Sequence, residues 1–439
     1  MDFPLWATIV VVIGLIFTLL ALGMWVGFVL AVVGIIVLTF FAGGKGFLVS
    51  SMQFIALNSV TLAAIPMYIF VGEVLLKSGL ANNLYRGVSK VLGVLPGGLA
   101  HSNIGACAIF AAISGSSVAT AATIGTVALH EQELLGYNRK LIFGSIAAGG
   151  TLGILIPPSI TMIVYGAFVE VSVARLFIGG IIPGIILAAL FMFWIGIVGV
   201  IRPHWTPRQR RISWGYIPQV FSALRELWPM LLLIIIIMGG IYGGVMSPTA
   251  AAGIASVVAL VIVGILGRLN FQLIKEATMA SVRTSNMILF LLVGAKILAL
   301  SISMIKLPAR LTEFVLMLDA DPLIIWVALI FLYLALGCFL DGFSLMVVTL
   351  PVIFPLIVGL GFDPIWFGVL LTILIECALL TPPVGFNLYV IHGLSGGQHI
   401  GDLLKGVVPF FLILLVSIAL YTVQPKLVTW LPATMFDMR

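Results

Sequence analysis

Charge is scarce in this chain of 439 residues, because only 8% of its residues are Asp, Glu, Lys or Arg while 62% are hydrophobic. This composition excludes an ordinary soluble protein and predicts an all-α polytopic membrane protein in a lipid bilayer. The net charge of +6 is spread over loops, as membrane orientation requires. It gives no reason to expect a nucleic-acid partner.

Signatures of enzymes, cofactor sites and disulfide scaffolds are also missing. The three cysteines lie in apolar segments, and an odd number offers no disulfide framework. The five histidines have no metal-ligand spacing. The glycine cluster at residues 43–46 lacks the spacing of a P-loop, and no nucleophile elbow is present. Nothing in the sequence therefore indicates ATP hydrolysis or any other enzymatic activity.

What the chain has instead is a series of apolar runs of about 20 residues, the length that crosses a bilayer. We predict ten spans: residues 5–21, 25–41, 62–80, 141–165, 181–201, 229–245, 249–267, 285–305, 364–391 and 407–428. Two flanking segments, 81–92 and 308–318, mix charged and apolar residues at helical spacing. They are expected to lie flat at the membrane interface.

Two of the spans contain paired prolines. Pro157 and Pro158 end the motif GGTLGILIPPS within residues 141–165, and Pro382 and Pro383 lie within residues 364–391. Proline lacks a backbone N–H and obstructs the preceding turn, so both helices should break in the middle of the membrane. Such a break is tolerated only where the freed carbonyls are buried or face a polar cavity. Two broken helices in matching positions indicate a transporter's binding site.

Two further apolar stretches have polar centres that contain glycine. Residues 98–129 contain SGSS at 114–117, and residues 323–360 contain GCFLDGFS at 337–344. Apolar arms of about fifteen residues would each reach only about halfway across a ~30 Å hydrocarbon core. Each stretch is therefore predicted to form a re-entrant hairpin.

The two halves of the chain repeat at a nearly constant offset. Pro157 matches Pro382 and Gly115 matches Gly342, at offsets of 225 and 227 residues. This predicts a duplication, with a first repeat at 1–201, a basic connector at 202–226 and a second repeat at 227–439. Five spans in each repeat is an odd number, so the second repeat should enter the membrane inverted.

The distribution of positive charge predicts the orientation. With the N-terminus outside, fourteen of the 21 Lys and Arg residues fall on inner loops, six on outer segments, and Lys296 within a span. This bias predicts that both termini are periplasmic. The first hairpin would then approach from the cytoplasm and the second from the periplasm.

Each hairpin tip should meet a broken helix near the midplane. Helix C-terminal ends present carbonyls with partial negative charge, and Na⁺ is a hard cation that prefers oxygen ligands. The first predicted sodium site takes Ser114, Ser116, Ser117 and carbonyls near Gly150, Gly153 and Pro157, and the second takes Gly337, Asp341, Thr381, carbonyls near Pro382, and Asn387. The candidate substrate contacts beside them are Thr120, Ser159 and Ser344.

Other interpretations of these residues stay open. Small residues such as Ser and Gly also mediate close helix packing in membranes, and the Asp341 tip could reach water. Glu73 is expected to pair with Lys77 four residues later. Lys296 could bind an anion or contact a partner helix, and Glu376 could tune the second cation site or cap a broken helix.

The motifs SGSSVATAATIG, GGTLGILIPPS, GCFLDGFS and LLTPPVGFNLYV, with the Arg-rich central loop, resemble the large membrane subunit of tripartite ATP-independent periplasmic (TRAP) transporters. The resemblance covers essentially the whole chain. Trp25 departs from it, since many members have proline near that position.

The resemblance implies an elevator-type fold in the bacterial inner membrane and Na⁺-driven import of an organic acid, of the C4-dicarboxylate or sialic acid class. It also implies two partners, a small membrane (Q) subunit and a periplasmic substrate-binding protein. The alternative within transporters is a stand-alone dicarboxylate or ion symporter or antiporter of the same superfamily. A channel and an intramembrane enzyme are competing classes, and the sequence shows no nucleophile–base pair for the latter.

Overall fold

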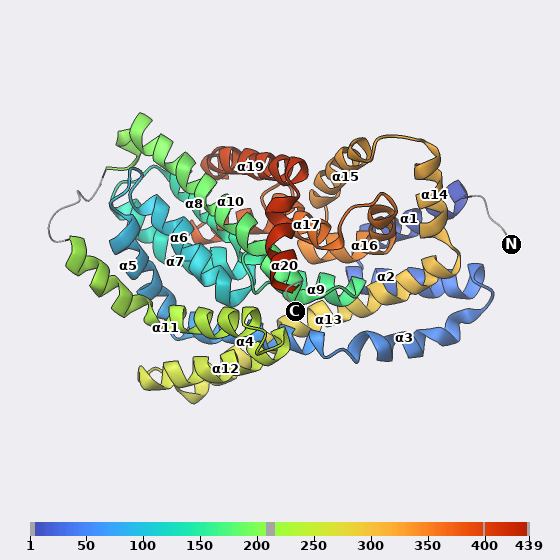
Figure 1. The fold of residues 1–439 in the computed structure, drawn as a ribbon, viewed down its shortest axis with the longest axis horizontal. Helices are drawn as coiled ribbons and strands as arrows, with labels where there is room; N and C mark the ends of the chain where they lie inside the picture. Colours follow the sequence, from blue (N-terminus) through green and yellow to red (C-terminus); the bar gives the residue numbers. More distant parts are fainter. Residues whose placement is uncertain (1–4, 208–215, 398–399, 437–439) are drawn as a thin grey trace.

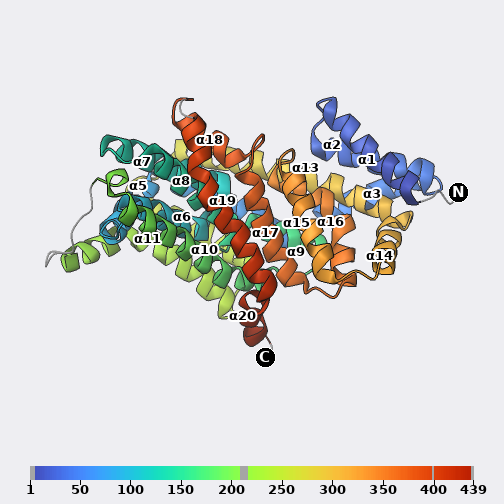
Figure 2. The same ribbon diagram turned by 90° about the horizontal axis from the view of Figure 1, so that it is seen from above.

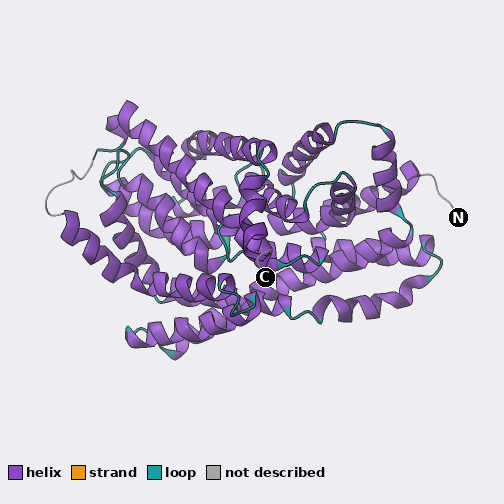
Figure 3. Ribbon diagram, in the orientation of Figure 1, coloured by secondary structure: helices purple, strands orange, loops and turns teal. Residues whose placement is uncertain are grey.

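The computed structural model describes residues 5–207, 216–397 and 400–436. Helices and loops account for all of these residues, and none of them forms a strand (Figure 3). Within these described residues, seven helical segments are long and apolar enough to cross a membrane, with Arg139–Val169 counted as one, and shorter apolar helices accompany them. The expected all-α architecture is therefore confirmed.

The described residues of the first half, 5–207, form ten α-helices. They are α1 Leu5–Ala21, α2 Val26–Ile36, α3 Leu48–Leu57, α4 Ala64–Lys77, α5 Leu80–Leu92, α6 Leu99–Ser114, α7 Ser117–Leu134, α8 Arg139–Leu155, α9 Ile160–Val169 and α10 Val173–Ile201. A π-helical turn, Val37–Phe41, continues α2. The pair α6 and α7 is the first helical hairpin, and α8 and α9 are the two parts of the first broken helix.

The second half has the same order of hairpin and broken helix. Its helices are α11 Tyr216–Tyr242, α12 Pro248–Ile265, α13 Phe271–Met304, α14 Leu307–Met317, α15 Pro322–Gly337, α16 Gly342–Gly359, α17 Pro364–Leu379, α18 Phe386–Leu394, α19 Ile400–Val423 and α20 Lys426–Phe436. The second hairpin is α15 with α16, and the second broken helix is α17 with α18. The repeat boundaries at 201 and 227 and the inverted orientation of the second repeat stay predictions.

Several helices differ in extent from the predicted spans. Helix α13 runs over 34 residues, whereas only 285–305 were expected, because its first half carries Lys275, Glu276 and Arg283 and has no apolar run. Helix α3 was not predicted, because its ten residues are too few for an apolar run of bilayer length. The segments Lys45–Leu57 and Thr61–Lys77, which contain α3 and α4, meet at a bend of 57°. Helix α11 begins at Tyr216, inside the expected connector, whose residues 208–215 lie outside the described part. The expected span 407–428 is divided between α19 and α20.

Helices α2, α4, α11, α12 and α13 form one layer, seen in the lower half of Figure 1, which we call the frame. Helix α2 lies directly against α13 at glycines, where a Cβ on Gly294 would stand 2.3 Å from the carbonyl oxygen of Gly27. Lys77 forms an ion pair of 3.3 Å with Glu276 of α13, in addition to its electrostatic interaction with Glu73, and so links two frame helices.

The hairpins and broken helices form the other part of the molecule, which we call the core body. The two hairpins lie on opposite sides of α17 and α19 (Figure 1, Figure 2). Every residue from Leu141 to Leu155 of α8 is buried, and so is every residue from Trp366 to Leu379 of α17. A helix that is enclosed on all sides needs no polar face. The two segments that precede the breaks are thus the centre of the protein.

Candidate functional site

The tip of the first hairpin lies directly against the first helix break. Gly115 adopts a left-handed conformation with φ 61°, which lets the chain turn between α6 and α7. Its carbonyl oxygen accepts a hydrogen bond of 3.3 Å from the N–H of Ile160, the first residue of α9. A Cβ at Gly115 would stand 2.7 Å from the carbonyl oxygen of Pro158. The hairpin tip and the break are therefore in backbone contact, as the sequence predicted.

Two polar side chains and one main-chain carbonyl, from three helices, meet beside this contact. The Ser117 hydroxyl donates to the carbonyl oxygen of Gly150 at 2.8 Å, and the Asn387 amide donates to the Ser117 hydroxyl at 3.0 Å. Ser117 is 2% exposed and Asn387 is fully buried. Asn387 Oδ1 has no hydrogen-bond partner among the described residues. A buried amide oxygen without a donor is a site suited to a cation.

The remaining residues of the first predicted site gather around the same tip. Ser114 and Thr120 share a hydrogen bond of 3.1 Å, and Thr120 also donates to the carbonyl oxygen of Ser116 at 2.7 Å. A Cβ at Gly153 would stand only 2.6 Å from that same carbonyl oxygen. Ser159 is fully buried and caps α9 by accepting from the N–H of Met162. The structure thus brings the first group together, including two of the candidate substrate contacts.

The sequence explains why carbonyl oxygens are available at this break. In an α-helix each carbonyl accepts from the N–H four residues later. Pro157 and Pro158 stand four residues after Gly153 and Ile154, and neither proline has an N–H to donate. The end of α8 therefore presents main-chain oxygens toward the hairpin tip, where the helix dipole adds partial negative charge.

The residues of the second predicted group are more exposed to solvent than those of the first. The Asp341 carboxylate caps α16, accepting from the N–H groups of Phe343 and Ser344 at 3.0 and 3.1 Å, and it also accepts from the Ser344 hydroxyl. It is partly buried at the hairpin tip. Thr381 donates from its hydroxyl to the carbonyl oxygen of Cys377 at 2.6 Å, and Pro382 is exposed. These contacts are local, within a few residues of each side chain.

The tip of the second hairpin packs on α17 through glycines. A Cβ at Gly337 would stand 2.6 Å from the Cβ of Ala378, and one at Gly342 would stand 2.5 Å from the side chain of Ile375. Gly337 and Asp341 therefore lie at the helix that precedes the second break. Hairpin and break are paired here as in the first half, although the tip makes fewer polar contacts with the break.

Asn387 belongs to the first group and not to the second, which corrects its expected place. After each break the chain crosses to the other repeat, so that α18 packs against α7 and α8 while α9 packs against α16 and α17. Asn387 was assigned to the second group because it is close to Pro382 in the sequence, but in the fold it lies beside Ser117. No local pattern could have revealed this exchange, because it depends on how the two repeats are docked.

Lys296 connects the frame to the core body. Its ammonium donates to the carbonyl oxygen of Phe168 at 2.9 Å and lies 4.7 Å from the centre of the Phe168 ring. Phe168 is next to the last residue of α9, whose C-terminal carbonyls attract positive charge. Of the two interpretations of Lys296, the structure supports contact with a partner helix.

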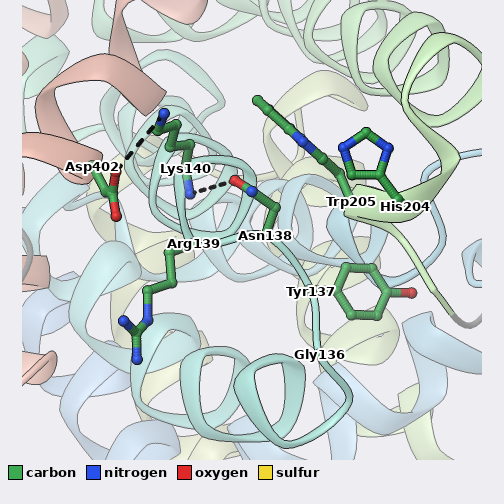
Figure 4. A pocket seen from close by; sticks show the side chains of 8 residues that line it. All are labelled: Gly136, Tyr137, Asn138, Arg139, Lys140, His204, Trp205 and Asp402. Atoms are coloured by element: carbon green, nitrogen blue, oxygen red, sulfur yellow. Dashed lines mark hydrogen bonds and ion pairs between the residues drawn. The ribbon is translucent and has the colours of Figure 1, made fainter.

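A pocket of about 440 Å³ lies apart from both groups, between the α7–α8 loop, the start of the connector and α19 (Figure 4). Lys140 faces Asp402 at 3.9 Å, and Arg139 pairs with Glu133 at 3.2 Å. Burial raises the pKa of the Tyr137 hydroxyl in this loop. Because both cations are already paired, this pocket is a weaker candidate for an anion site than its composition suggests.

The fold and the paired hairpin–break contacts define the class: a multi-pass helical membrane protein built as a transporter. The family model of the tripartite ATP-independent periplasmic transporter, DctM component, matches residues 13–427. The C4-dicarboxylate TRAP transporter large permease protein DctM of Pseudomonas aeruginosa is 34% identical over 376 residues, which cover 85% of this chain and 86% of that protein.

One further relative and one solved structure are also similar to this chain. The sialic acid TRAP transporter large permease protein SiaM of Vibrio cholerae is 29% identical over 417 residues, covering 94% of this chain and 96% of that protein. The YdaH transporter of Alcanivorax borkumensis has a similar fold, with a TM-score of 0.56, 16% identity and coverage of 85% and 86%. The chain belongs to the DctM family of TRAP transporter large permeases.

Proposed function

We propose that this protein is a sodium-driven permease that imports an organic acid by an elevator movement. The observation that carries the proposal is the set of oxygens at the first hairpin tip, where Ser117, Gly150 and Asn387 meet the end of α8. Hydroxyl, amide and main-chain oxygens are the ligands of a hard cation. Among the described residues, no group of three or more His, Cys, Asp and Glu could hold a transition metal.

A second sodium site lies at the second hairpin in this proposal. Asp341 would supply the negative charge that offsets part of the dehydration cost of the ion. Gly337, Thr381 and the carbonyls near Pro382 would supply further oxygens. Thr120, Ser159 and Ser344 border the two groups and are the proposed substrate contacts.

The substrate in this proposal is an organic acid of the C4-dicarboxylate or sialic acid class. This choice is supported by the two relatives described above, which are named as transporters of these compounds. A tripartite system implies two partners, a periplasmic substrate-binding protein that delivers the acid and a small membrane (Q) subunit. The permease would then lie in the bacterial inner membrane with both termini in the periplasm.

The movement would carry the core body past the frame. Contacts within the core body include backbone and buried polar groups. The frame meets the core body through packed helices, such as α13 against α16 and α4 against α6, and through the contact of the Lys296 ammonium with α9. Alternating access by displacement of one body against another around fixed sites is the common pattern of such transporters.

Uptake by the reconstituted complex tests the proposal. The permease, its small subunit and the binding protein encoded beside them are placed in proteoliposomes, and the uptake of the binding protein's ligand is measured. We expect sigmoidal activation by Na⁺ and no uptake when choline replaces it. Full uptake in choline under a proton gradient would refute sodium coupling. Uptake without any binding protein would instead favour a stand-alone symporter.

A further inference from the structure

Glu376 is a buried carboxyl group that the sites above do not use. It lies in α17, three residues before that helix ends at Leu379, and its side chain is fully buried. Neither carboxyl oxygen has a hydrogen-bond partner among the described residues. The matching position in the first repeat is Thr151, a neutral residue whose hydroxyl donates to the carbonyl oxygen of Ala148 at 2.6 Å. The carboxyl is therefore a feature of the second repeat alone.

Few titratable groups face this carboxyl. Those that interact with it are Tyr421 of α19 and its own neighbour Cys377. Tyr421 donates its hydroxyl proton to the carbonyl oxygen of Pro183 at 3.0 Å, which leaves it no proton for Glu376. The charged and histidine residues of the helices packed against α17 stand toward helix ends. In the described part they are Arg139, Lys140, Arg175, His392, Asp402, Lys405 and Lys426, together with Asp341, which caps α16.

Two other tyrosines on helices packed against α17 are also engaged elsewhere. Tyr165 of α9 donates to the carbonyl oxygen of Pro364 at 2.7 Å, and Tyr333 of α15 shares a hydrogen bond of 2.9 Å with Thr349. No cation in the described part forms an ion pair with Glu376. An ionised carboxylate here would be neither paired nor hydrogen-bonded, which is the most costly state for a charge at membrane depth.

A proton satisfies this carboxyl better than a metal ion does. Na⁺ would need several oxygen ligands, whereas neither carboxyl oxygen has a hydrogen-bond partner among the described residues. A proton neutralises the group without further ligands. We propose that Glu376 is a proton-binding site whose proton competes with Na⁺ binding at the second hairpin. This proposal rests on the proposed function, because the competing ion is the one assigned to that site.

The coupling follows from the position of Glu376 on α17. Its neighbours Ile375 and Ala378 carry the contacts with Gly342 and Gly337 of the second hairpin, and the carbonyl of Cys377 accepts from Thr381. The same helical turns thus hold the proton site and the residues of the second cation site. A negative charge on Glu376 favours a cation bound nearby in a medium of low dielectric constant, and protonation removes that attraction.

The half-saturating Na⁺ concentration for uptake, measured from mildly acidic to mildly basic pH, tests this inference. In the wild-type complex we expect it to rise several-fold as pH falls. Glu376→Gln keeps the shape of the protonated side chain and should give a high half-saturating concentration that no longer changes with pH. Glu73→Gln, which neutralises a half-buried carboxyl of the frame, is the matched control and should keep the wild-type pH dependence.

The outcomes separate the two proposals. Absence of Na⁺-dependent uptake in the wild type would overturn the proposed function itself. Na⁺-dependent uptake with the same pH dependence in the wild type and Glu376→Gln would overturn only the proton site. If Glu376→Gln does not transport, infrared spectroscopy of the purified proteins tests whether Glu376 binds a proton. We expect a protonated-carboxyl band in the wild type that disappears at basic pH and is absent from the variant; a band that persists in the variant would overturn the inference.

Discussion

The amide nitrogen of Asn387 lies 3.0 Å from the hydroxyl oxygen of Ser117, and this hydrogen bond joins residues 270 positions apart in the chain. It places α18, the helix after the second break, beside the tip of the first hairpin. The first proposed site is then built from both halves of the chain, so the first half cannot form it alone. The predictions below test this arrangement.

Removal of the Asn387 side chain should weaken Na⁺ binding. Asn387→Ala eliminates a buried amide oxygen that has no hydrogen-bond partner among the described residues. We expect the half-saturating Na⁺ concentration to rise about tenfold, as loss of about 1.4 kcal/mol would give. The measurement is Na⁺ activation of uptake in proteoliposomes. Asn270→Ala, which removes the cap of frame helix α13, is the control and should lower stability by about 1 kcal/mol without changing Na⁺ activation. Wild-type activation in Asn387→Ala would show that the amide is structural.

Loss of charge at Asp341 should impair transport while the fold is retained. Asn is as good a helix cap as Asp, so Asp341→Asn keeps the α16 cap and removes only the negative charge. We expect a lower apparent Na⁺ affinity or no transport, with an unchanged thermal unfolding temperature. Asp363→Asn is matched to it, because Asp363 caps α17 through the N–H groups of Ile365 and Trp366. An equal effect of both variants on Na⁺ activation would contradict a special role for Asp341.

A methyl group at Gly153 should displace the first hairpin tip. Its Cβ would stand 2.6 Å from the carbonyl oxygen of Ser116, a backbone atom that cannot move alone. We therefore expect Gly153→Ala to reduce Na⁺ binding at least tenfold, measured on the purified protein with radioactive sodium. Gly253→Ala, where the nearest atom is the Met67 sulfur at 3.7 Å, should bind Na⁺ like the wild type. Normal binding in Gly153→Ala would mean that the tip does not form the ion site.

A cross-link between frame and core body should stop transport but preserve Na⁺ binding. Cysteines at Lys296 and Phe168, whose contact joins α13 to α9, are bridged with a bifunctional thiol reagent after Cys338 is replaced by alanine. The matched control bridges Phe28 and Phe290, two frame residues whose rings lie 4.6 Å apart, and should leave uptake unchanged. Continued uptake across the Lys296–Phe168 link would favour local opening of the hairpin tips over an elevator movement.

The positions of the breaks and hairpins follow from local chemistry. Pro157, Pro158, Pro382 and Pro383 cannot continue a helix wherever they lie, so the ends of α8 and α17 were predictable from the sequence. Gly115 allows a left-handed turn, so the centre of the first hairpin was predictable too. The hydropathy pattern predicted most of the frame helices. It did not predict the charged first half of α13, nor the short helix α3 outside the frame, because neither is an apolar run of bilayer length.

The sequence by itself determined the membrane class, the two hairpins, the two broken helices and the grouping of Ser114, Ser116 and Ser117 at one tip, because each depends on residues close in the chain. Only the tertiary structure decided that Asn387 joins Ser117, that Lys77 pairs with Glu276 and that Lys296 reaches Phe168. These contacts depend on how helices dock across the two halves, where burial and close packing act between surfaces that no local pattern encodes. The unpartnered state of Glu376 was decided in the same way, since a carboxyl is isolated only by the helices that surround it.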